Sequence, residues 1–267
     1  MIGDHSDDQA MKILERMLVC LLLVCWGLTT GAQTIPILVY HRFDPVLWGP
    51  TTVRTAVFES QLAWLEQHHY RVLPLHAAID ALRSHIEPRE PKVAITVDDG
   101  HRSVYTEMFP AILKRRIPVT LFIYPSAISN APYALTWQQL RTMRASGLVE
   151  VQSHTYWHPN FRKERARLAA TEYDAFVKVQ LERSMQTLES RLGIKVDALA
   201  WPFGIYDLQL EAAARQAGYQ AAFAYEGGPA RAGCDEFAIP RIQVSDHDTG
   251  LRFGKLLGDP GSPGRTR

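Results

Sequence analysis

The chain has 267 residues, of which 46% are hydrophobic and 21% are charged, and its formal net charge at pH 7 is +1. This composition excludes an intrinsically disordered chain, a collagen-like repeat and a small protein held together by disulfides. Because 29 basic residues are balanced by 28 acidic ones, the chain lacks the basic excess of nucleic-acid-binding proteins, and we expect no nucleic-acid partner.

The first 32 residues have the pattern of a secretory signal peptide. Lys12 and Arg16 precede an apolar run at residues 18–28, and small residues suited to cleavage follow it. The run is too short to span a bilayer comfortably, so we expect signal cleavage, export to the periplasm or the extracellular space, and no stable membrane insertion afterwards. An uncleaved anchor is the alternative interpretation, and Met11 is an alternative translation start because the preceding residues are acidic.

Short apolar runs alternate with amphipathic stretches along the rest of the chain. Strands are predicted at seven places: 35–40, 93–97, 119–124, 149–152, 198–201, 221–225 and 237–239. Apolar residues at helical spacing predict helices between them, at 58–65, 75–82, 137–147, 177–192 and 208–217.

Strands that alternate with helices require crossover connections, which predicts an α/β fold with a mainly parallel sheet. About seven strands without a glycine-rich nucleotide loop favour a closed or partly closed β/α barrel over a dinucleotide-binding sheet. We expect a single domain at residues 33–257, with the motif-bearing core at 92–245 and a disordered Gly- and Pro-rich tail at 258–267.

Two adjacent carboxylates end the strand predicted at 93–97. Asp98 and Asp99 are followed by Gly100, which permits a tight turn. In a β/α barrel the C-terminal strand ends carry the active site, and two adjacent like charges there need a cation or a shared proton. On its own, however, this tripeptide is more typical of a turn that caps the next helix.

Two histidines follow the strand predicted at 149–152. Because His154 and His158 are four residues apart at another strand's C-terminal end, one turn of chain can aim both rings at one point. Two imidazoles and one carboxylate, with positions left for water, form the ligand set of a catalytic zinc site. A single histidine is usually structural, but here that explanation would have to hold twice.

These residues resemble the motifs of the polysaccharide deacetylases, the NodB-homology group in carbohydrate esterase family 4. Residues 96–100 (TVDDG) are similar to the family's Thr-Phe-Asp-Asp-Gly motif, and residues 153–158 to its paired-histidine motif. Further similar segments at 36–41, 135–147 and 218–241 extend the resemblance over most of the mature chain.

The resemblance implies a distorted, partly open (β/α)7 barrel and metal-dependent removal of N-acetyl groups from an N-acetylglucosamine-containing polysaccharide, with release of acetate. It implies that Asp99, His154 and His158 bind one divalent metal ion, with zinc expected first and cobalt or nickel as alternatives, and that Asp98 is the general base. The chemistry is sensible in itself, because a metal activates water while a carboxylate removes its proton. A catalytically weak glycan-binding homologue and a glycan O-acetyl esterase are the alternative functions.

The third family motif, Arg-Pro-Pro-Tyr-Gly, is altered here to AWPFG at residues 200–204, a version similar to that of exported poly-β-1,6-N-acetylglucosamine deacetylases. The family's arginine, which orients the base, is replaced by Ala200. We expect Arg241 to pair with Asp98 instead, and the alternative is that it pairs with an unrelated surface acid or stays solvated. His247 is a candidate for the family's late catalytic histidine, with a surface turn as the alternative.

Four further residues are candidates for contact with the substrate. Tyr40 and His41 lie near the end of the first predicted strand, and Trp201 and Phe203 lie in the altered motif. Trp201 is expected either to stack on a sugar ring or to belong to the core, and Phe203 to supply a backbone N–H to an oxyanion.

Overall fold

The computed structural model describes residues 34–84 and 90–258. The predicted signal peptide, and the predicted tail beyond Gly258, lie outside the described residues. Within the described ranges, no helix is both long enough and apolar enough to cross a membrane.

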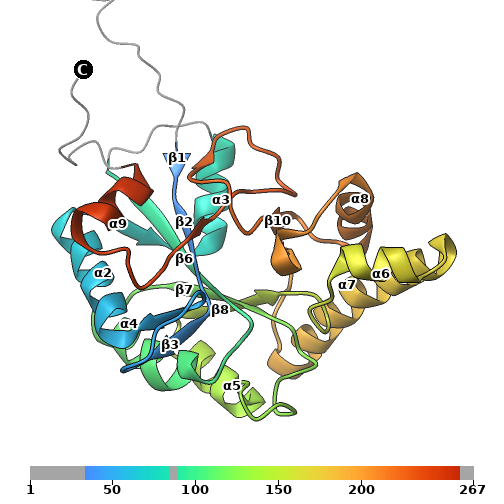
Figure 1. Ribbon diagram of the computed structural model, residues 1–267, viewed down its shortest axis with the longest axis horizontal. Coiled ribbons are helices and arrows are strands. Elements are labelled where there is room, and N and C mark those ends of the chain that lie inside the picture. Colours follow the sequence, from blue (N-terminus) through green and yellow to red (C-terminus); the bar gives the residue numbers. More distant parts are fainter. Residues whose placement is uncertain (1–33, 85–89, 259–267) are drawn as a thin grey trace, which may run out of the picture. The chain divides into compact units, whose positions relative to one another are not determined.

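Parallel strands form the centre of the molecule (Figure 1). The main sheet has the order β10-β9-β8-β7-β6-β2-β12, and β5 pairs with β6 beside this path. Its strands are β2 (Ile37–Tyr40), β5 (Arg71–Leu73), β6 (Lys92–Asp98), β7 (Val119–Ile123), β8 (Val149–Ser153), β9 (Ala198–Ala200), β10 (Ala221–Phe223) and β12 (Ile242–Gln243). All pairings in this sheet are parallel, as the alternation of strands and helices predicts.

A short segment before β12 brings the two edges of the sheet together. Ile239 forms a single parallel bridge with Phe223 of β10, and Ile242 then pairs with Leu38 of β2. Because a single bridge and a few backbone hydrogen bonds of Ile239 and Glu236 join this segment to the β10 region, the closure is loose, and the partly open (β/α)7 barrel is confirmed. The strand predicted at 237–239 is wrong: Pro240 has no N–H to continue a ladder, and the strand begins at Ile242.

Two small sheets flank the main one. Strand β1 (Thr34–Ile35) pairs antiparallel with β11 (Ala230–Arg231), and β3 (Arg42–Asp44) pairs parallel with β4 (Thr52–Arg54). Pro36 separates β1 from β2, so the strand predicted at 35–40 is split in two.

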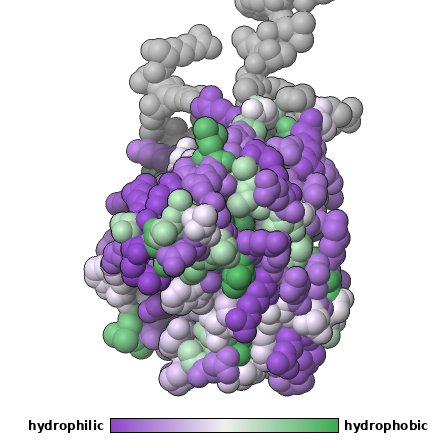
Figure 2. Space-filling model, turned by 90° about the vertical axis from the view of Figure 1, so that its right-hand side faces the viewer, coloured by the Kyte–Doolittle hydropathy of each residue, from purple (hydrophilic) through white to green (hydrophobic). Residues whose placement is uncertain are grey.

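Helices pack around the sheet and bury their apolar stripes against it (Figure 1). They are α2 (Thr55–Gln67), the π-helical turn η1 (Val104–Met108), α4 (Phe109–Arg115), α5 (Trp137–Ala145), α6 (Phe161–Arg167), α7 (Ala170–Leu192), the 3-10 turn η2 (Pro202–Gly204), α8 (Leu208–Ala217) and α9 (Gly250–Leu257). On the side that carries α6, α7 and α8, hydrophilic residues dominate the surface, with isolated hydrophobic ones between them (Figure 2).

One helix, α3 (Leu75–Ser84), packs against the opposite face of the sheet. Its Leu75 and Ile79 belong to a second apolar cluster with Ile37 and Phe122, whereas the neighbouring strand residue Leu38 belongs to the cluster beneath the other helices. Because successive strand residues point to opposite faces, α3 lies on the inner face of the curled sheet. Polar side chains occupy the two ends of this inner face.

Candidate active site

The residues of both sequence motifs lie at the C-terminal ends of neighbouring strands. Asp98 is the last residue of β6, and His154 directly follows β8. After these strand ends the backbone turns sharply. The backbone angle φ is 73° at Asp99 and 63° at His158, and residues other than glycine rarely adopt such positive values. Gly100 is required beside them, because a Cβ there would lie 2.7 Å from a methyl group of Ile123.

Asp99, His154 and His158 converge on one point, as predicted. Asp99 Oδ1 lies 3.6 Å from Nε2 of each histidine, and the three ligand atoms lie within 4.8 Å of one another. Nδ1 of His154 is 2.8 Å from the carbonyl oxygen of Ala200. Since a carbonyl only accepts, Nδ1 carries the proton and the Nε2 lone pair is free, which suits a metal ligand.

Burial sets the protonation of this triad. It lowers the pKa of His154 to about 3 against the opposing influence of Asp98, and it also lowers the pKa of His158. Burial raises the pKa of Asp99. Two neutral imidazoles and one carboxylate in a tight cluster fit a single divalent ion, with a remaining position open to the cleft.

Arg241 makes the predicted contact with Asp98. Its Nη1 and Nη2 donate to the two carboxylate oxygens at 2.8 and 2.7 Å, and both side chains are almost fully buried. Nε of Arg241 donates to the carbonyl of Ala224, and Nη1 also donates to Oγ1 of Thr96. Burial alone would raise the pKa of Asp98, but Arg241 and His154 outweigh it and lower that pKa to about 2.

The altered third motif contacts the two histidines of the ligand cluster, through the backbone carbonyl of Ala200 and through the ring of Phe203. The carbonyl of Ala200, where the family has arginine, orients His154. Phe203 has a φ of 56°, is 58% exposed, and places its ring centroid 4.5 Å from that of His158. Trp201 is fully buried and donates from Nε1 to the carbonyl of Phe237. The structure therefore follows the core alternative for Trp201, because its ring has no exposed face for a sugar.

A cleft of about 340 Å³ opens above these residues. It is lined by His41, Arg42, Thr51, Asp98, Asp99, His154, His158, Phe203, Tyr225 and Glu226, with Trp201 beneath its floor. The ring of His41 packs edge-on against Tyr225. Burial lowers the pKa of His41, although the charges of Asp98 and Asp99 raise it. No sequence pattern pointed to Arg42, Tyr225 or Glu226. Arg42 begins β3, and the other two lie in the loop after β10, and the barrel topology brings these segments together.

Two candidate residues lie outside this cleft, and their predicted roles are corrected. Tyr40 is 1% exposed and donates to Oε1 of Gln61, because it points to the helix-covered face of β2. His247 is exposed and packs against Trp48. Its neighbour Asp246 is held by Arg54, which fixes a surface turn at this point.

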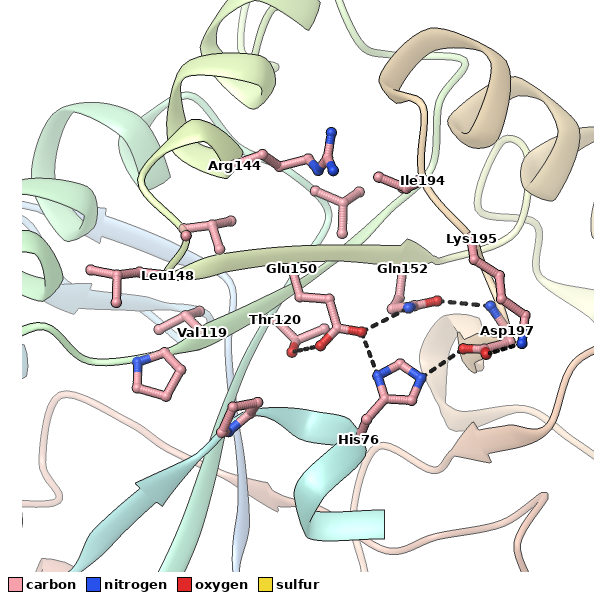
Figure 3. A pocket seen from close by; sticks show the side chains of 15 residues that line it. His76, Val119, Thr120, Arg144, Leu148, Glu150, Gln152, Ile194, Lys195 and Asp197 are labelled. Carbon is pink, nitrogen blue, oxygen red and sulfur yellow. Dashed lines mark hydrogen bonds and ion pairs between the residues drawn. The ribbon is translucent and has the colours of Figure 1, made fainter. Parts of the chain in front are cut away.

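A second cleft, of about 530 Å³, lies at the opposite end of the inner face, near the first residues of β7 and β8 (Figure 3). There His76 of α3 lies between two carboxylates, with Nδ1 2.7 Å from Glu150 and Nε2 2.7 Å from Asp197. The hydrogen bond to Glu150, opposed by partial burial, raises the pKa of His76 to about 9. Both ring nitrogens then donate, so His76 has no lone pair for a metal.

Comparisons with known proteins identify similar sequences and structures. Residues 85–222, just over half of the chain, match the family model described as polysaccharide deacetylase. A poly-β-1,6-N-acetyl-D-glucosamine N-deacetylase of Escherichia coli (strain K12) is 24% identical over 77% of this chain, which spans only 35% of that protein. The protein of the same name from Staphylococcus aureus (strain MRSA252) is 25% identical, over 73% of this chain and 68% of its own length.

Solved structures share the fold. IcaB from Ammonifex degensii superposes with a TM-score of 0.74 at 25% identity, over 84% of this chain and 97% of its own. The deacetylase PplD from Streptococcus pyogenes gives a TM-score of 0.75 at 21% identity, over 85% of this chain and 99% of its own.

Proposed function

The chain belongs to the polysaccharide deacetylase family, and from this premise we propose that it is a metal-dependent hydrolase that removes N-acetyl groups from an N-acetylglucosamine-containing polysaccharide and releases acetate. One observation carries the proposal: the carboxylate of Asp98, held in a buried bidentate pair by Arg241, lies beside the three converging ligand atoms of Asp99, His154 and His158. The names of the E. coli and S. aureus relatives support the same substrate class.

Asp99, His154 and His158 would hold the metal ion, for which zinc is the first expectation and cobalt or nickel the alternatives. The fit rests on the donor set, one carboxylate and two imidazoles, and on the free Nε2 of His154. When bound, the ion supplies Lewis acidity to the acetamide carbonyl and to the attacking water.

Asp98 would take the proton from the attacking water. Arg241 uses one lone pair on each carboxylate oxygen, which fixes the plane of the group and keeps it ionised. Oδ2 also lies 3.8 Å from Nε2 of His154, so the remaining lone pairs face the ligand cluster. A general base must be held within reach of the proton in this way.

His41 would protonate the leaving amine after taking up a proton from solvent, and the charges of Asp98 and Asp99 favour that protonated form against the effect of burial. When the carbon–nitrogen bond of the acetamide breaks, the nitrogen needs a proton, and His41 lines the cleft without belonging to the ligand triad. This assignment replaces His247, whose ring packs on Trp48 outside the cleft. Phe203, turned toward His158 by its positive φ, would contribute its backbone N–H to the developing oxyanion.

Acetate release by purified residues 33–267 tests the proposal. We expect release from N-acetylglucosamine oligomers, loss of release after chelation, and recovery with zinc. Release from O-acetylated xylan alone would show an ester hydrolase instead, and release from neither substrate would leave a glycan-binding homologue. The signal peptide predicted at 1–32 supports action outside the cytoplasm, which fractionation of cells that produce the full chain would test.

A further inference from the structure

Both histidines of the ligand cluster lie on one loop, residues 154–158, whose backbone is strained. The backbone angle φ is 61° at Thr155 and 63° at His158, and for a β-branched residue such as Thr155 this conformation is a genuine outlier. Such conformations persist only where the surrounding structure holds them. One contact lies within the loop, because the backbone N–H of His158 donates to Oγ1 of Thr155 at 3.3 Å.

Further contacts come from three buried polar side chains that the proposed catalytic steps do not use. Gln180 and Ser184 are four residues apart on α7, where they are 3% and 0% exposed, and the other buried residues of this helix are hydrophobic. Tyr219, which is also buried, directly follows Gly218 at the end of α8. We name Gln180, Ser184 and Tyr219 the loop support.

Gln180 holds the end of the loop that carries His158. Its Oε1 accepts the backbone N–H of Trp157, the residue before this histidine, at 3.1 Å. A buried amide on a helix face that is otherwise hydrophobic costs free energy unless it is hydrogen-bonded. The bond to the loop compensates part of this cost.

Ser184 and Tyr219 hold the other end of the loop through Ser153, the last residue of β8. Oγ of Ser153 lies 2.8 Å from Oγ of Ser184 and 2.8 Å from the hydroxyl of Tyr219. The same Oγ accepts the backbone N–H of strained Thr155 at 3.2 Å. Because the hydroxyl of Tyr219 is also 3.0 Å from the carbonyl oxygen of Leu181, this cluster joins the loop to α7.

We propose that the loop support consists of positioning residues for the metal centre. They hold the histidine loop in the conformation in which Nε2 of His154 and of His158 both lie 3.6 Å from Oδ1 of Asp99. A loop that is already ordered loses less conformational entropy when an ion binds, so the support raises the affinity for the ion. The inference rests on the metal centre of the function proposed above.

Zinc affinity of the metal-free protein, measured by competition with a chromophoric chelator, tests the proposal without turnover. Tyr219→Phe and Gln180→Met each remove polar contacts and keep most of the side-chain volume. We expect the zinc dissociation constant to rise by about tenfold or more in each variant, the usual effect of losing a contact outside the ligand shell. Ser184→Ala, which removes only a hydroxyl, serves where a larger change prevents folding.

Tyr40 and Gln61 provide a matched control. Both are 1% exposed, and the hydroxyl of Tyr40 donates to Oε1 of Gln61 on the helix-covered face of β2. The amide of Gln61 then donates to the carbonyl oxygens of residues 245 and 248, away from the histidine loop. Tyr40→Phe and Gln61→Met should therefore lower the melting temperature of the metal-free protein, as the support variants do, but leave the zinc dissociation constant unchanged.

The visible absorption of the cobalt-loaded protein gives a second readout, because its intensity reports the coordination geometry. It should change in the support variants and stay unchanged in the control variants. Unchanged zinc affinity in Tyr219→Phe and Gln180→Met, or equal weakening in the control pair, would make the support an ordinary part of the core and overturn the inference. Wild-type protein that binds no zinc would overturn the metal centre and the inference together. Zinc binding without acetate release from either glycan would contradict the deacetylase function alone.

Discussion

The two ends of the barrel's inner face each hold a histidine near two carboxylates, yet the two histidines have opposite properties. At the C-terminal strand ends, the side chain of His154 is 3% exposed and its pKa falls to about 3, mainly through burial. At the other end, the side chain of His76 is 46% exposed and its pKa rises to about 9, mainly through its hydrogen bond to Glu150. Residue types alone therefore do not decide whether such a cluster binds a metal.

The difference lies in what the neighbouring carboxylates already bind. Asp98 is paired with Arg241 in a buried contact, and its charge raises the pKa of His154 by less than burial lowers it, so Nε2 of His154 stays free. Glu150 and Asp197 instead contact the two nitrogens of His76 directly, at 2.7 Å each. The first arrangement provides a neutral ligand, and the second is an ion-pair clamp between α3, β8 and the start of β9.

The largest expected effect on turnover comes from substitution of Asp98, the carboxylate at the C-terminal strand ends. Asp98→Asn should reduce kcat at least about 100-fold, a typical loss for a general base, while metal content stays unchanged. Asp99→Asn should lose metal and activity together. Acetate release and elemental analysis on the same samples check both variants, and near-normal turnover of metal-loaded Asp98→Asn would assign the base to another group.

His41→Gln should lower kcat on N-acetylglucosamine oligomers by about 100-fold, because the departing amine would then lack a proton donor. An aryl acetate has a leaving group that needs no proton. Hydrolysis of 4-nitrophenyl acetate should therefore suffer far less in the same variant. An equal loss on both substrates would contradict a role for His41 in leaving-group protonation.

Arg241→Lys should lower turnover by about tenfold or more, since an ammonium cannot reproduce the bidentate contact with Asp98. Metal content should be unchanged. Weaker pairing raises the pKa of Asp98 from about 2, so the acidic limb of the pH–rate profile should move to higher pH. Unchanged turnover with an unchanged profile would reduce Arg241 to a structural residue.

The clamp at the other end should affect stability and not turnover. His76 has a pKa raised above its ordinary value, so its contribution to stability is complete below about pH 6.5 and is lost as the pH rises through about 9. After allowance for solvent screening we expect about 1 kcal/mol, or about 2–4 °C in Tm. Melting curves of the wild type and His76→Gln should differ at pH 6 and converge by pH 10. A constant difference across this range would show that His76 is not a cation in the folded protein.

Sequence patterns predicted the site at the C-terminal strand ends well, because its residues belong to short motifs that directly follow predicted strands. Asp98, Asp99, His154 and His158 all follow from this placement, and Arg241 from the rule that such ends share one face of a barrel. Strands of two residues, such as β11 and β12, are too short for any periodicity to mark.

The failures of prediction have physical causes that no short sequence motif records. A strand's face alternates with each residue, so a shift of one position separates buried Tyr40 from His41 in the cleft. The outward position of His247 depends on the contact of Asp246 with Arg54, 192 residues away in sequence. Such distant contacts leave no periodic signal.

Metal content tests the comparison between the two ends most directly, because each end holds a histidine that can be removed. We expect about one zinc ion per chain in wild-type residues 33–267, none in His158→Ala, and an unchanged amount in His76→Gln. Circular dichroism should show all three proteins folded. Equal metal in the wild type and His158→Ala, or a loss of metal in His76→Gln alone, would contradict the assignment of the metal centre to the C-terminal strand ends.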